Sequence, residues 1–151
     1  MCFETFKKIH WKNVLFAALI YLVIAYVIRQ IEVIITMPFY FDPNYLSVWS
    51  TLMMPEPGPP PLSFTLISIV FTFTTGLVLA ALWAALKDFL PKQFWAKVLA
   101  YTDIVVALML VLSFLPMVLL INLPLLLIFS WFITGILTTF VGALIFAKML
   151  K

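Results

Sequence analysis

Four long stretches of the chain are made almost entirely of apolar residues, and polar or charged residues mark the boundaries between them. A helix needs about 20 mainly apolar residues to cross the hydrocarbon of a bilayer. Backbone N–H and C=O groups find no water there, so each stretch must be helical, and the alternation typical of a β-barrel is missing. We predict an all-α integral membrane protein, a four-transmembrane-helix bundle forming a single membrane domain over residues 1–151. The predicted spans are residues 14–37, 63–86, 98–120 and 123–148.

The last two spans share one apolar stretch, which is too long for a single helix. Asn122-Leu123-Pro124 supplies the break, because Asn122 can cap the fourth helix and Pro124 is tolerated in a first turn. Pro116 is expected to kink or end the third helix.

Residues 38–62 form the one sizeable predicted loop, on the outer side. Asp42 followed by Pro43 is typical of a helix start and predicts a short amphipathic helix over residues 43–53, lying in the membrane interface. The proline-rich segment from Pro55 to Pro61 is predicted to be an extended strut. We expect the loop to be a stiff connector. A lid over an outward-facing cavity is the alternative.

Composition and charge agree with a membrane location. The chain is 66% hydrophobic and 10% charged, with a mean hydropathy of +1.20, whereas soluble domains are about half apolar and a quarter charged. The net charge of +3 reports topology rather than nucleic-acid binding, because the basic residues flank the spans. Under the four-helix assignment eight of the nine basic residues fall on one side, which predicts N-in/C-in orientation in a multi-pass protein of the plasma membrane. These basic residues are Lys7, Lys8, Lys12, Lys87, Lys92, Lys97, Lys148 and Lys151.

The two halves of the chain resemble one another. The pattern K-x-x-W-x-x-V-L occurs from Lys8 to Leu15 and again from Lys92 to Leu99. The pattern F-x-T-G recurs in the second and fourth spans. We predict a tandem repeat of two helical hairpins, related by a pseudo-twofold axis along the membrane normal.

Small residues recur at four-residue spacing in the second and fourth spans. Such stripes let helix backbones approach closely in lipid. We expect these two helices to lie at the centre of the bundle, in contact through the stripes. A stripe that docks a second protomer or a partner subunit is the alternative. The stripe residues are Ser68, Thr72, Gly76, Ala80, Ala84, Gly135, Thr139, Ala143 and Ala147.

Apart from Lys148 at the end of the fourth, three charged residues lie within the predicted spans, where charges are costly. Arg29 and Glu32 are three residues apart and are predicted to form an ion pair in the outer leaflet. Asp103 is the better candidate for an ion or proton site, together with Thr75 and Thr134. The alternative for Asp103 is a first-turn carboxylate stabilised by the helix dipole and a nearby lysine.

Other chemistry is sparse. Cys2 is the single cysteine and His10 the single histidine, and no nucleophile motif or phosphate-binding loop is present. We therefore expect no enzyme activity, cofactor, metal centre or nucleic-acid partner. The predicted function is an accessory or assembly subunit packing in a larger membrane complex. The alternative is a small oligomeric transporter or channel that uses Asp103. The expected partners are the lipid bilayer and either further copies of the chain or other membrane subunits.

Overall fold

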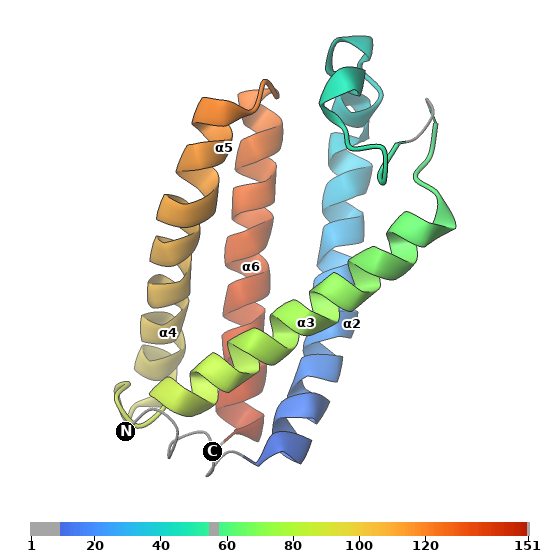
Figure 1. Ribbon diagram of the computed structural model, residues 1–151. Coiled ribbons are helices and arrows are strands. Elements are labelled where there is room, and N and C mark those ends of the chain that lie inside the picture. The colour runs from blue at the N-terminus through green and yellow to red at the C-terminus, as the bar shows by residue number, and fades with distance from the viewer. Residues whose placement is uncertain (1–9, 55–57, 151) are drawn as a thin grey trace.

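The computed structural model describes residues 10–54 and 58–150, and within them the chain is helical with no strands (Figure 1). Four helices are long and apolar enough to cross a membrane, as predicted. Cys2, Lys7, Lys8, Lys151 and the first part of the predicted strut (residues 55–57) lie outside the described residues. The spans are α2 (Trp11–Tyr40), α3 (Leu62–Leu86), a composite third span (Phe94–Leu120) and α6 (Leu125–Met149).

The third span consists of three helical pieces in direct succession: α4 (Phe94–Met109), the π-helical turn η2 (Leu110–Phe114) and α5 (Leu115–Leu120). Pro116 lies at the start of α5 and has no N–H to donate to the preceding turn. The widened π turn directly before Pro116 absorbs this break in the hydrogen-bond ladder. The disturbance expected at Pro116 is therefore present, although the helix continues to Leu120.

α6 begins differently from the prediction. Its N-terminal cap is Pro124, whose carbonyl accepts bonds from Leu127 N at 2.9 Å and Ile128 N at 3.2 Å. Asn122 is exposed two residues earlier, and no side chain caps the helix. The predicted capping by Asn122 is wrong, because the bend at Leu123 separates the amide from the first turn.

The loop after α2 folds back on the end of that helix. It contains a 3-10 helix, η1 (Pro43–Val48), and the Asp42 carboxylate accepts a bond from Asn44 N at 2.9 Å, as predicted for a cap. This helix ends earlier than the predicted range 43–53. Trp49 then stacks on Tyr40 with ring centroids 5.1 Å apart and donates from Nε1 to the Tyr40 carbonyl at 3.2 Å.

The start of α2, the end of α3, the start of α4 and the end of α6 lie at one end of the bundle (Figure 1). We call this the lysine-rich end, and the opposite end, with η1, the η1 end. α3 slants across the bundle, so its first turns lie far from α5, and its last turns approach α4 (Figure 1). The lysines at the lysine-rich end are Lys12, Lys87, Lys92, Lys97 and Lys148.

The central pair of helices is α2 and α6, and not α3 and α6 as expected. α6 packs closely against both α2 and α4, whereas α3 packs mainly on α2. The reason is the side chain of Tyr21 on α2, which lies against two glycines. A Cβ on Gly76 of α3 would come within 2.7 Å of its ring, and a Cβ on Gly142 of α6 within 3.0 Å. The small-residue stripe of α3 therefore packs against the Tyr21 ring of α2 at Gly76.

Large aromatic side chains fill the core at the lysine-rich end. Trp83 of α3, Tyr101 of α4 and Phe146 of α6 are almost fully buried. Trp83 and Tyr101 meet edge to face at 5.0 Å, and Tyr101 donates its hydroxyl to the Leu79 carbonyl at 2.6 Å. These contacts fix the end of α3 to the start of α4.

The helix arrangement is less symmetric than a twofold repeat requires. An axis relating the hairpins would pair the α2–α6 contact with an equivalent α3–α4 contact. α2 and α6 pack along much of their length, whereas α3 and α4 meet chiefly at the Trp83–Tyr101 contact. The repeat therefore rests on the sequence pattern alone.

Candidate functional site

Asp103 lies on the outer surface of α4. Its neighbours Tyr101 and Thr102 are buried against the bundle, and Asp103 itself is exposed. Among the described residues, no side chain or backbone group forms a hydrogen bond or ion pair with its carboxylate. The position is about 9 Å along the helix from Lys97, at a rise of about 1.5 Å per residue. The structure thus places this carboxylate on the outside of the bundle, away from the interior.

The three residues predicted to form a polar site lie on different surfaces. Thr75 is exposed on α3 and donates its hydroxyl to the Phe71 carbonyl at 2.8 Å. Thr134 is buried on α6. Asp103, Thr75 and Thr134 therefore do not converge within one chain.

The exposed face of α4 carries small residues around Asp103. Ala96, Ala100, Asp103 and Ala107 follow one another at spacings of four, three and four, so they lie on one side of the helix. Ala107 is exposed and the other two alanines are half-buried. The third span is also the least buried: 6% of its most apolar stretch is buried in the chain, compared with 22–33% in the other spans.

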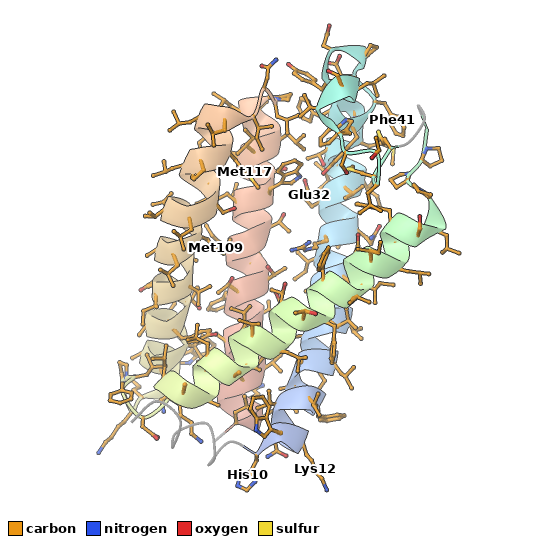
Figure 2. The ribbon with its side chains drawn as sticks, in the orientation of Figure 1. His10, Lys12, Glu32, Phe41, Met109 and Met117 are labelled. Carbon is orange, nitrogen blue, oxygen red and sulfur yellow. The ribbon has the colours of Figure 1, made fainter. Side chains whose placement is uncertain are left out.

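Glu32 belongs to a polar seam between α2 and α6, and its side chain lies between these two helices in Figure 2. One carboxylate oxygen, Oε1, accepts bonds from Ser130 Oγ at 2.7 Å and Thr36 Oγ1 at 2.9 Å. Arg29 is exposed one turn before it. The structure thus gives Glu32 hydroxyl partners, one of them on α6, while its pairing with Arg29 stays a prediction.

The seam continues in both directions from Glu32. Toward the lysine-rich end, the Tyr21 side chain lies beside Thr138 and Gly142 of α6. Toward the η1 end, Trp131 donates from Nε1 to the Tyr40 hydroxyl at 2.8 Å, and Trp49 lies 6.2 Å from Trp131 between ring centroids.

Sequence reasoning missed this seam, although a signal for it was present. α6 carries a second run of small residues at four-residue spacing, one position before the predicted stripe. These residues are Ser130, Thr134, Thr138 and Gly142. α6 therefore carries two adjacent stripes. Ser130, Thr138 and Gly142 of one stripe contact α2, while Gly135 and Thr139 of the other lie against Met109 of α4.

Two hollows border the bend of the third span, around Ser113 and Met117. One is an open groove of about 210 Å³, and the other, of about 70 Å³, lies between this bend and α6. Neither is lined by Asp103, Thr75, Thr134 or Glu32. Within residues 10–54 and 58–150, no three His, Cys, Asp or Glu side chains lie close enough together to hold a metal ion.

Comparison of the chain with protein-family models, with curated proteins and with solved structures found no match.

Proposed function

We propose that this protein is an assembly subunit that binds a transmembrane helix of a different membrane protein through the exposed face of α4. The observation that carries the proposal is Asp103, an exposed carboxylate on a helix long and apolar enough to span a membrane, with no partner among the described residues. A charge at such a position costs a few kcal/mol in hydrocarbon and is retained where a partner satisfies it.

The surroundings of Asp103 suit a helix partner. Ala96, Ala100 and Ala107 leave little side-chain bulk on this face, which permits the close backbone approach that drives helix association in lipid. The low burial of the third span leaves this face available. The third span is thus the natural place for an additional helix.

Charge defines the kind of partner. A twofold homodimer through this face would bring two Asp103 carboxylates together, because the same patch is used on both subunits. Like charges in a low-dielectric environment repel strongly. We therefore infer a different chain, with Lys, Arg or another hydrogen-bond donor at the depth of Asp103.

We test this by site-specific photocrosslinking of the full chain in its native membrane. A photoreactive amino acid replaces Ala107 beside Asp103, and in a matched control it replaces the exposed Val78 of α3. The expected result is a crosslink from position 107 to one transmembrane peptide that contains a donor residue. This crosslink is absent at position 78 and is lost in Asp103→Leu.

One combination of results would contradict the proposal. If purification in mild detergent recovers this chain alone as a defined oligomer, with position 107 crosslinking only to itself, the assembly role is refuted. That result favours the alternative, a small oligomeric transporter or channel in which several Asp103 side chains line a path.

We also infer that the lysine-rich end faces the cytoplasm of a cell whose plasma membrane holds the protein. The clustering of Lys12, Lys87, Lys97 and Lys148 at one end supports this orientation through the positive-inside rule. The similar sequence patterns of the two halves support a repeat of two hairpins that later diverged in packing.

A further inference from the structure

Positive charge is concentrated at the lysine-rich end. Five lysines lie there, and Asp88 is the one described carboxylate in the α3–α4 connection and in the terminal turns of the helices at this end. The side chains of His10 and Lys12 point away from the helices (Figure 2). In the described part of the chain, no carboxylate forms an ion pair with the exposed Lys12, Lys92 or Lys148. The described chain therefore does not neutralise these three ammonium groups.

The same end also exposes large aromatic side chains. Trp11 is 50% exposed, Trp95 56% and Phe89 83%. Tryptophan at the end of a spanning helix typically lies among the lipid headgroups, because its ring is apolar and its N–H is polar. At the η1 end, by contrast, Trp49 and Trp131 pack together, with ring centroids 6.2 Å apart. The lysine-rich end is thus the one where exposed tryptophans and exposed lysines occur together.

The connection between α3 and α4, residues 87–93, is held in place by the bundle. The Phe89 N–H donates to a carbonyl of the last turn of α3 at 2.9 Å. Leu90 packs against the core cluster that contains Trp83. The exposed side chains of Phe89 and Lys92 therefore lie on either side of an anchored residue. A contact surface that is ordered in advance loses less conformational entropy when a ligand binds.

We propose that the lysine-rich end binds the headgroups of anionic phospholipids, with Lys92 and Phe89 of the α3–α4 connection and Lys12 and Trp11 of α2 as contacts. Ammonium groups attract headgroups with a net negative charge, and they do so less for zwitterionic headgroups, which carry the same phosphate but no net charge. The aromatic rings contact the boundary between headgroup and acyl chain.

The proposal adds a ligand to a charge pattern that so far indicated orientation only. The positive-inside rule describes how spans insert and requires no preference for one lipid over another. Lipid selectivity is therefore a separate property, and it applies to whichever leaflet this end faces. It also rests on residues other than Asp103, so it is independent of the proposed assembly role.

The test uses the full chain, purified in mild detergent and titrated with phosphatidylglycerol or with phosphatidylcholine of identical acyl chains. Native mass spectrometry reports the dissociation constant for each lipid. We expect tighter binding of phosphatidylglycerol. Lys92→Gln and Lys12→Gln should each weaken it by about fivefold, the scale on which one lysine changes binding to an anionic surface. Binding of phosphatidylcholine should stay constant in both variants.

Three controls separate charge from the other contributions. Arg29→Gln removes an exposed basic residue far from this end and should leave the ratio of the two dissociation constants unchanged. Phe89→Ala should weaken both lipids by the same factor, because the contact of the ring does not depend on headgroup charge. Inorganic phosphate should not displace phosphatidylglycerol, since a soluble anion makes no contact through acyl chains.

Three results would overturn the proposal. One is equal affinity of the unaltered chain for the two lipids. Another is an effect of both lysine variants that is no larger than that of Arg29→Gln. The third is displacement by inorganic phosphate, which would assign the lysines to a soluble anion. Lys12 and Lys92 are exposed, so both variants are expected to fold, and size-exclusion profiles verify this. Each lysine variant also serves as a check on the other.

Discussion

The three glycines inside the spanning helices provide a sharp test of the packing. Replacing any of them by alanine adds one methyl group and improves helix propensity by about 1 kcal/mol in each case. The propensity gain is common to the three variants, so differences between them report what the new methyl group meets.

The atoms that the new methyl group would meet differ between the three positions in how easily they can move. At Gly76 the new Cβ would lie 2.7 Å from the Tyr21 ring and 3.2 Å from the Ala18 carbonyl oxygen, which belongs to the α2 backbone. At Gly142 it would lie 3.0 Å from the Tyr21 ring and at an ordinary contact distance of 3.4 Å from the Phe146 ring. At Gly135 it would collide with the terminal methyl group of Met109, which is flexible and can move aside.

Overpacking a close-packed core typically costs about 1–3 kcal/mol. We therefore expect Gly76→Ala to lower the free energy of unfolding by about 1–3 kcal/mol relative to Gly135→Ala, with Gly142→Ala in between. Adding Tyr21→Ala should relieve Gly142→Ala almost completely. It should relieve Gly76→Ala only in part, because the Ala18 carbonyl remains.

The measurement is reversible unfolding with SDS in mixed micelles, followed by tryptophan fluorescence. The order of the three variants is the test. If Gly135→Ala is the least stable, or if Tyr21→Ala changes none of the costs, Tyr21 does not lie between α3 and α6.

Two further predictions concern single contacts, and a third concerns the membrane topology. Tyr101→Phe removes a hydrogen bond to a carbonyl of α3 and should lower the free energy of unfolding by about 0.5–1.5 kcal/mol in the same assay. Trp49→Ala removes the side chain that fixes the loop to the end of α2, so limited proteolysis within residues 41–54 should accelerate while cleavage elsewhere stays constant. In a Cys2→Ser background, Asn122→Cys and Lys92→Cys should react with impermeant thiol reagents from opposite sides of the membrane, because the third span lies between them, and labelling of both from one side would refute that crossing.

The spans could be predicted because apolar length and backbone hydrogen bonding leave few alternatives. The cap at Asp42 was equally local, since it depends on a side chain and an amide two residues apart. The central pair of helices was not predictable in this way. A stripe of small residues shows that something approaches closely, but not which helix supplies it, and the ring of Tyr21 came from α2.

The candidate site could likewise be predicted only in part. Sequence identified Asp103, Arg29 and Glu32 correctly as charges within spans, because charge and depth can be read from spacing. It could not place their side chains around the helix relative to neighbours. Glu32 consequently has a partner on α6, Ser130, which is far away in sequence.

The slant of α3 has a consequence for the surrounding lipid. Near the lysine-rich end the hydrogen bond from the Tyr101 hydroxyl to α3 holds α3 and α4 together, so we expect no lipid between these two helices there. Near the η1 end the first turns of α3 lie away from α5 (Figure 1), and we expect lipid acyl chains to contact both helices there. We therefore expect the protein to occupy more area in one leaflet than in the other, so that its fit in the bilayer depends on membrane curvature.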